Sequence, residues 1–198
     1  MIALIDYGAG NLTSVRKALH AVGADVQVPH DPADLDRAMG VIVPGVGNFL
    51  ATSALGEAWR EGILQAVGRG SPLFGICLGL QWLFEGSTEA PGSPGLALMT
   101  GRCDRLEGGA DLKVPHVGWN ALQFPRESRL FEGIAEGAQV YFTHSFAAPV
   151  TNDATAVTTH GKPFASAVER GQVFGVQFHP EKSGEIGLQV LKNFLHAV

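Results

Sequence analysis

Apolar and polar residues follow two different periods in the first half of the chain. Four short apolar segments predict buried strands of a parallel sheet. They cover residues 2 to 6, 24 to 28, 40 to 43 and 73 to 76. Between them, apolar residues recur at every third or fourth position, which predicts helices over residues 12 to 22, after residue 31, over 55 to 67 and after 77. This βαβαβαβα order is typical of a parallel sheet with helices on both faces.

The second half of the chain has a different pattern. Residues 86 to 111 contain Gly, Ser and Pro and few apolar runs, which predicts irregular structure. Strand patterns follow at residues 113 to 124, 139 to 147, 154 to 159, 164 to 169 and 172 to 178. Arg170-Gly171 predicts a hairpin turn, and a final helix places Ile186, Val190, Leu191, Phe194 and Leu195 on one face. We therefore expect an α/β fold with a mostly parallel central sheet, helices on both faces and additional antiparallel strands in the second half, forming one domain over residues 1 to 198.

The helices of the first half begin and end at suitable residues. Asn11 can cap the first helix and Gly23 can end it, while Asp31-Pro32 predicts the start of a short second helix. The glycine loop before Asn11 invites a dinucleotide-binding interpretation, but the third glycine of G-x-G-x-x-G would fall on Thr13. A tight turn is the better interpretation, and we predict no cofactor.

Composition excludes several classes of protein. The 198 residues carry a formal charge of −5 and show no basic stripe, which argues against a nucleic-acid partner. No apolar run reaches the roughly 18 residues that a membrane span needs, and the first residues lack the basic segment of a signal peptide. Two cysteines in a chain of this length do not form a disulfide framework, so we expect a reducing cytoplasm.

The strongest chemical motif is G-x-C-x-G at residues 75 to 79, between an apolar strand and a helical pattern. A nucleophile elbow has this form, because the turn strains the nucleophile and its neighbours must lack side chains. The N-terminus of the following helix would favour a thiolate at Cys77. A buried structural cysteine is the alternative, and for an isolated cysteine it would be the better one.

A nucleophilic cysteine needs a base, and seven histidines are available. His144 and His179 each lie near the end of a predicted strand. His179 stands out because Glu181 follows two residues later, on the same side of an extended chain, where it can fix the histidine tautomer. A surface histidine beside a solvated glutamate is the alternative. Since H-x-x-x-H and C-x-x-C spacings are missing from the sequence, we predict no metal site.

An oxyanion hole is the remaining requirement. The backbone N–H of Leu78, next to the nucleophile, is one natural donor. A second should come from another loop at the same sheet edge. The turn at residues 44 to 47, P-G-V-G, ends the neighbouring strand and its glycines let the backbone face a substrate. A generic turn at the end of a strand is an equally good interpretation.

Three motifs in this order, P-G-V-G at 44 to 47, G-I-C-L-G at 75 to 79 and H-P-E at 179 to 181, resemble the class I, or triad, glutamine amidotransferases. Within that class, D-Y-G-A-G-N-L at 6 to 12, P-H-V-G-W-N at 115 to 120 and F-H-P-E-K-S at 178 to 183 resemble the HisH-type glutaminase subunits of imidazole glycerol phosphate synthase. The resemblance spans nearly the whole chain and implies a flavodoxin-like sheet.

The resemblance implies a mechanism and a set of site residues. Cys77 would attack the side-chain amide of glutamine, His179 would protonate the departing ammonia and Glu181 would orient His179. Backbone N–H groups at Leu78 and in the turn of Val46 and Gly47 would hold the oxyanion. By family resemblance the substrate-binding residues are Gln81, His144, Ser145 and Phe146.

The same resemblance implies a partner. A HisF-type (β/α)₈ cyclase would form a heterodimer with this chain and use the ammonia to make imidazole glycerol phosphate and aminoimidazole carboxamide ribotide in histidine biosynthesis. Asn11, Trp119 and Lys182 would face the cyclase. Without the resemblance these residues would be interpreted as a turn residue, a core aromatic and a solvated lysine.

Other functions remain open at this level. A cysteine peptidase or hydrolase could use the same elbow without a partner, although H-P-E after a strand favours the glutaminase. An inactive homologue kept for assembly is a second alternative, and the intact Cys77, His179 and Glu181 argue against it. Glutaminases of the pyridoxal-phosphate and purine pathways share the triad but not the D-Y-G-A-G-N opening.

Overall fold

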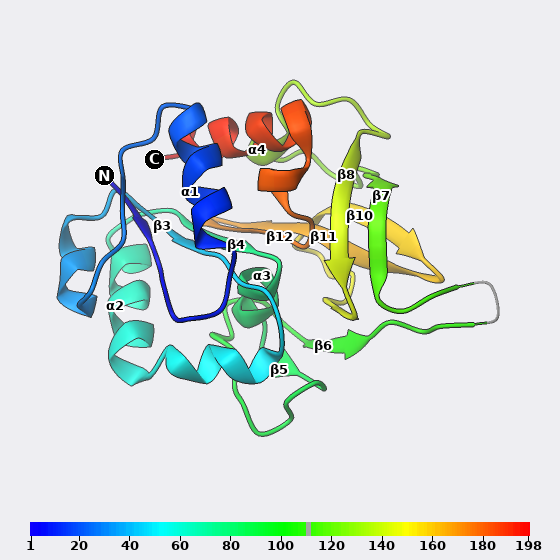
Figure 1. Ribbon diagram of the computed structural model, residues 1–198, viewed down its shortest axis with the longest axis horizontal. Helices are drawn as coiled ribbons and strands as arrows, with labels where there is room; N and C mark the ends of the chain where they lie inside the picture. The colour runs from blue at the N-terminus through cyan, green and yellow to red at the C-terminus, as the bar shows by residue number, and fades with distance from the viewer. Residues whose placement is uncertain (110–111) are drawn as a thin grey trace.

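The computed structural model describes residues 1–109 and 112–198. Within them, seven strands form a central sheet in the order β10-β11-β12-β4-β3-β1-β2. The pairs along β12, β4, β3, β1 and β2 are all parallel. These five strands span Val173–Val176, Leu73–Ile76, Gly40–Val43, Ile2–Leu4 and Val26–Gln27. The expected mostly parallel sheet is confirmed (Figure 1).

Alternation along the strands divides the core into two layers. Ile2 and Leu4 of β1 pack with helices α1 and α4 on one face, whereas Ala3 and Val41 pack with α2 and α3 on the other. Figure 1 shows α1 and α4 together on one side of the sheet and α2 and α3 on the opposite side. The four helices span Leu12–Ala21, Gly184–His196, Glu57–Gly68 and Leu78–Leu83. Side chains buried from both faces explain why the strands read as continuous apolar runs.

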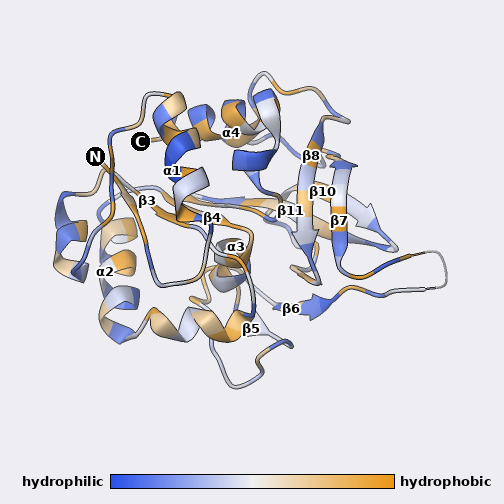
Figure 2. Ribbon diagram, viewed as in Figure 1, coloured by the Kyte–Doolittle hydropathy of each residue, from blue (hydrophilic) through white to orange (hydrophobic). Residues whose placement is uncertain are grey.

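Hydropathy follows this layering. The central strands are apolar, while α1 and α2 contain both apolar and polar residues (Figure 2). Large aromatic rings fill the core, and Phe74 stacks on Phe194 of α4 with ring centroids 4.9 Å apart. In the part of the chain that is described, none of the helices combines the length and the apolar character that crossing a bilayer requires.

The second half adds antiparallel strands. β10 and β11 extend the sheet antiparallel to each other, and β11 runs antiparallel to β12 through the predicted turn at Gly171. β7 and β8 pair separately as a two-stranded antiparallel sheet. These four strands span Ala154–His160, Lys162–Arg170, His116–Ala121 and Gln139–His144. The predicted antiparallel strands of the second half are confirmed.

Several boundaries differ from the sequence prediction. The segment predicted as irregular contains β5 (Gly86–Ser87) and β6 (Arg102–Arg105), which form a small sheet with β9 (Phe146–Ala147). These short strands have little hydrophobic alternation, so the pattern gave no signal for them. The last two residues of that predicted segment, 110 and 111, lie outside the described residues. The helix predicted over residues 55 to 67 begins at Glu57, because the 3-10 helix η2 (Phe49–Ala54) precedes it and Leu55 lies in the break.

The predicted helix ends are confirmed. The Asn11 side chain accepts a hydrogen bond from the Ser14 N–H (3.3 Å), and Gly23 follows α1 with a φ of 85°. Asp31 caps the 3-10 helix η1 (Pro32–Arg37), in which Pro32 occupies the first turn. Two further 3-10 helices, η3 and η4, span Arg129–Phe131 and Pro180–Lys182. The caps satisfy backbone N–H groups that have no partner inside the helix.

Candidate functional site

Cys77 lies at a strained turn between β4 and α3. Its backbone has φ 54° and ψ −105°, a conformation that side-chain-bearing residues rarely adopt. A methyl group on Gly79 would overlap the Val43 carbonyl oxygen, and one on Gly75 would lie 2.6 Å from the Gly79 backbone. The turn therefore requires both glycines of G-x-C-x-G. Strain of this kind concentrates where a side chain must be presented for chemistry.

The sheet brings His179 to the same edge. β12 and β4 are parallel neighbours, with Gly175 opposite Gly75 and Val176 opposite Ile76, and the Cys77 N–H donates to the Val176 carbonyl (2.8 Å). His179 follows β12 by three residues, so it lies beside Cys77.

His179 and Glu181 form a buried pair. The His179 Nδ1 and Glu181 Oε1 atoms are 2.8 Å apart, and the two side chains are 2% and 1% exposed. The route differs from our expectation, because residues 180 to 182 form the 3-10 helix η4 rather than an extended chain. Pro180 starts this turn, and the turn folds Glu181 back toward the ring. The pairing has therefore a different geometric cause from the one assumed in the sequence analysis.

The charge on His179 depends on its neighbours. Burial lowers the pKa of His179, but contact with Cys77 and Glu181 outweighs burial and raises that pKa to about 9. Its Nε2 atom is buried and makes no hydrogen bond within the described residues. The imidazole can therefore hold a proton at neutral pH and present it from Nε2.

The Leu78 N–H is already engaged in this conformation. It donates to the Gly45 carbonyl (3.3 Å). Because C=O and N–H point in opposite directions across a trans peptide, the Val46 N–H points away from Leu78. A methyl group on Gly45 would overlap the Tyr7 hydroxyl and approach Leu78, whereas Gly47 has a φ of 98°. The two predicted oxyanion donors do not converge on one point here.

A cavity of about 270 Å³ opens beside Cys77. Of the residues expected to bind substrate or oxyanion, all but Val46 line it: Gly47, Leu78, Gln81, His144, Ser145 and Phe146. The Gln81 Nε2 donates to the Phe146 carbonyl (2.8 Å), which joins α3 to strand β9. The structure therefore brings together residues that are up to about 100 positions apart in the sequence, from Gly47 to Phe146, around one small space.

Glu89, which no sequence pattern predicted, lines the same cavity. Its Oε2 accepts from the Phe49 N–H (2.7 Å), which fixes the carboxylate at the cavity wall. Glu89 lies in the segment predicted as irregular, which is why no pattern pointed to it. Among the described residues, it is the only carboxylate lining this cavity.

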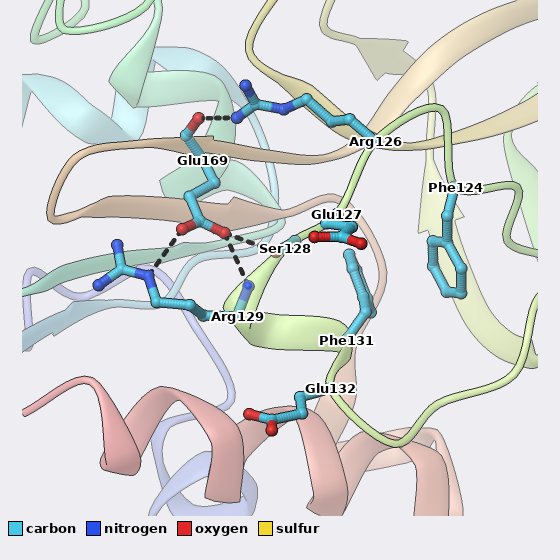
Figure 3. A pocket seen from close by; sticks show the side chains of 8 residues that line it. All are labelled: Phe124, Arg126, Glu127, Ser128, Arg129, Phe131, Glu132 and Glu169. Atoms are coloured by element: carbon cyan, nitrogen blue, oxygen red, sulfur yellow. Dashed lines mark hydrogen bonds and ion pairs between the residues drawn. The ribbon is translucent and has the colours of Figure 1, made fainter.

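A larger cavity, about 720 Å³, lies elsewhere (Figure 3). Most of its charged groups bind one another: Glu169 accepts from Ser128 and from the backbone and side chain of Arg129, and Arg126 donates to the Glu169 carbonyl. Phe124 and Phe131 stack with centroids 4.7 Å apart. None of the residues expected to act in catalysis or to bind substrate lines this cavity.

The residues expected at a partner interface are exposed. Trp119 is 57% exposed on β7, and its ring lies edge-on to Tyr141. The Lys182 Nζ lies 5.7 Å from the centre of the same Tyr141 ring. Asn11 is exposed at the start of α1. Trp119 is thus not the core aromatic that its residue type alone would favour.

Two buried histidines near the cavity resist protonation. Burial, together with the charge of neighbouring histidines, lowers the pKa of His116 from 6.5 to about 4 and that of His144 from 6.5 to about 3. Their side chains contact directly, with His116 Nδ1 3.0 Å from His144 Nε2. The unfolded chain therefore takes up protons at higher pH than the folded chain does.

We expect stability to fall as the pH drops below about 6.5 toward 4. Each histidine contributes up to about 1.4 kcal/mol per pH unit, since the folded-state pKa values are depressed. Denaturant titrations at several pH values measure this slope. His116→Asn should reduce it, whereas His196→Gln, at an exposed position on α4, should not. An equal slope in wild type and His116→Asn would contradict the assignment.

Comparison with known proteins agrees with this arrangement. The family model for class I glutamine amidotransferases matches residues 3–198, and the chain belongs to that family. A crystal structure of a glutamine amidotransferase superimposes with a TM-score of 0.76 at 20% identity, covering 100% of this chain and 98% of that one. PurLQS from Thermotoga maritima gives a TM-score of 0.76 at 19% identity, over 98% and 97%.

Within this class, the chain groups with the HisH subunits of imidazole glycerol phosphate synthase. It is 48% identical over 199 residues to that subunit of Moorella thermoacetica, covering 98% of this chain and 93% of the relative. It is 47% identical over 200 residues to that of Thermococcus kodakarensis, covering 98% of both. The expected class and subfamily are confirmed.

Proposed function

We propose that this chain hydrolyses glutamine to glutamate and ammonia through Cys77, His179 and Glu181. One observation carries the proposal: the buried His179–Glu181 pair lies beside a strained Cys77, at a cavity that also holds a fixed carboxylate. The class of the protein supports it, because class I glutamine amidotransferases form the matching family.

The reaction would proceed in two steps. The Cys77 sulfur attacks the side-chain amide carbon of glutamine, and protonated His179 delivers its Nε2 proton to the leaving ammonia. A thioester to Cys77 remains. His179 then removes a proton from water, which attacks the thioester carbonyl and releases glutamate and the thiol. Glu181 holds the Nδ1–H and stabilises the imidazolium.

The oxyanion of both steps needs donors. Leu78 N–H is the natural one, but it is bound to Gly45 in this conformation. Rotation of the peptide between Gly45 and Val46 would free the Leu78 N–H and turn the Val46 N–H toward the cavity. We infer that the resting form has low activity and that rotation of this peptide activates it.

Substrate recognition would rest on the cavity walls. Glu89 offers a carboxylate to the α-ammonium group of glutamine, which suits a charged pair in a partly buried space. Gln81 and the loop of His144, Ser145 and Phe146 line the same cavity. A cavity of about 270 Å³ suits an amino acid and excludes a folded protein chain.

The ammonia needs a destination, because in bulk water it is protonated and lost. The HisH relatives are subunits of imidazole glycerol phosphate synthase. We propose a HisF-type (β/α)₈ cyclase as the partner, in histidine biosynthesis, docked on the exposed face of Trp119, Lys182 and Asn11. Both cysteines are free thiols, which fits a reducing compartment such as the cytoplasm.

Glutamate release from glutamine tests the proposal. The chain is assayed alone and with a HisF-type cyclase plus its ribonucleotide ligand, and Cys77→Ala serves as the control. We expect low release by the chain alone, a strong rise with the liganded cyclase and none from Cys77→Ala. If the cyclase does not change the rate of glutamate release, the glutaminase activity would be supported and the proposed partner would be rejected.

The same assay separates the alternatives. A folded chain that releases no glutamate beside a competent cyclase would overturn the proposal. Hydrolysis of peptide or ester substrates in its place would favour the hydrolase interpretation. A chain that binds the cyclase and releases nothing would favour a role in assembly alone.

A further inference from the structure

The Phe146 carbonyl fixes the direction of a chain of buried hydrogen bonds. It lies 2.9 Å from the His144 Nδ1 atom and 2.8 Å from the Gln81 Nε2 atom. A carbonyl oxygen can only accept, so both nitrogens must carry the hydrogen. This settles the tautomer of His144 and the orientation of the Gln81 amide from geometry.

In one direction from the Phe146 carbonyl, the series of hydrogen bonds reaches Cys77. The Gln81 Nε2 also donates to the Gln177 Oε1 (3.1 Å), and this orients the Gln177 amide so that its Nε2 faces Cys77. The Gln177 Nε2 and Cys77 Sγ atoms are 3.6 Å apart, a suitable length for an N–H···S hydrogen bond. Gln177 is completely buried and Gln81 is 4% exposed.

In the other direction, the series of hydrogen bonds reaches strand β7. Since His144 Nδ1 carries the hydrogen, neutral His144 accepts at Nε2 from the His116 Nδ1–H (3.0 Å). His116 then accepts at Nε2 from the Asn120 Nδ2 (3.3 Å), which also donates to the Thr159 carbonyl (3.1 Å). The donor and acceptor roles are consistent at every hydrogen bond of this branch. The branch ends on two backbone carbonyls, those of Phe146 and Thr159.

We propose that Gln177 is a catalytic residue that stabilises the Cys77 thiolate, and that His116 and His144 position it by holding the Phe146 carbonyl. This inference deepens the proposed glutaminase function and rests on it. The thiolate must form before it can attack, and a hydrogen bond to the charged form favours that form. An amide donor does this without adding a charge that would oppose the imidazolium.

Other charged and titratable groups surround Cys77. Protonated His179 favours the thiolate, whereas the carboxylates of Glu181 and Glu89 oppose it. The Tyr7 hydroxyl stays neutral, because burial and proximity to Cys77 raise its pKa. Gln177 is thus the neutral donor to Cys77 beside groups of both signs, and its removal should be measurable.

Alkylation of Cys77 by iodoacetamide tests the Gln177 end, because only the thiolate reacts and no glutamine is needed. Rates are measured against pH in a Cys103→Ala background. Gln177→Met removes the donor at similar volume, and Gln177→Glu replaces it with a carboxylate. We expect Gln177→Met to slow alkylation at pH 7 about tenfold, Gln177→Glu to slow it more, and both profiles to move to higher pH.

Matched variants separate this role from a structural one. Thr155→Val removes a buried hydroxyl that has no partner in the described residues and should leave alkylation unchanged. A structural role for Gln177 would lower the melting temperature and leave the pH profile in place. Folded Gln177→Met and Gln177→Glu proteins with wild-type profiles would overturn the proposal.

The His116 end has its own test, which does not depend on the folding of Gln177 variants. His116→Asn places an amide N–H where the ring has Nδ1 and keeps the bond to His144, whereas His116→Leu does not. We expect His116→Leu to slow alkylation about threefold, on the order of a weakened hydrogen bond, and His116→Asn to restore most of the rate. Equal rates in the two variants would overturn the positioning role. Glutamate release by the wild type is measured in a separate assay. Its absence would refute the proposed glutaminase function, whereas the alkylation rates would still test the role of Gln177.

Discussion

His179→Asn is expected to reduce the rate of glutamate release by about a thousandfold in the complex with the liganded cyclase. General acid–base groups contribute about 10²–10⁴ in rate. The asparagine amide N–H occupies the place of Nδ1, so the bond to Glu181 and the packing of the buried pair are kept. The Nε2 proton, which the leaving ammonia needs, is lost. Single-turnover formation of the thioester measures the first step directly.

Two control measurements accompany this variant: its melting temperature and the rate at which Cys77 is alkylated. Thermal melting should change little, because the buried carboxylate of Glu181 keeps a donor. Alkylation of Cys77 at pH 7 should also slow, since the neighbouring imidazolium is gone. A His179→Asn protein that still turns over glutamine within tenfold of wild type would show that another group transfers the proton.

Gly79→Ala is expected to destabilise the protein by more than about 3 kcal/mol, or to prevent folding. The added methyl group would overlap the carbonyl oxygen of Val43, which belongs to the backbone of the neighbouring strand and cannot move aside cheaply. For a chain of this size, that corresponds to a fall in melting temperature of roughly 10 °C. Differential scanning calorimetry measures the change.

Gly68→Ala is the matched control. Gly68 is the last residue of α2, and a methyl group there would meet nothing within 4 Å. Alanine should stabilise the helix, by up to about 1 kcal/mol, because glycine loses more backbone freedom on folding. If both substitutions changed stability by the same amount, the close approach at Gly79 would not be what the elbow requires.

The sequence predicted the fold through patterns that act locally. The apolar runs ending at Val43 and Ile76 marked buried strands, and the glycines around Cys77 marked a turn that only glycine permits. The histidine and glutamate of H-P-E were found because they lie two residues apart. In each case the informative residues lie within a few consecutive positions, so a single segment of the sequence is sufficient to recognise the feature.

The remainder of the site depends on contacts across the sheet. Gln177 touches Cys77 because β12 and β4 are neighbours in register, and His116 touches His144 because β7 pairs with β8. Glu89 comes from a segment with no hydrophobic period. The state of the peptide after Gly45 is a backbone orientation, which no residue type encodes. Such features require the register of strands that are distant in sequence.

The parallel pairing of β4 with β12 has a consequence for control. Four consecutive residue pairs join the two strands, from Leu73 and Val173 to Ile76 and Val176. Drawing Cys77 away from His179 would break several ladder bonds at once, each worth about 1 kcal/mol. Turning the peptide after Gly45 breaks a single long hydrogen bond, from the Leu78 N–H to the Gly45 carbonyl (3.3 Å). If a partner activates the protein as proposed, a few kcal/mol of binding energy would suffice to turn this peptide, while the paired strands would keep Cys77 and His179 aligned.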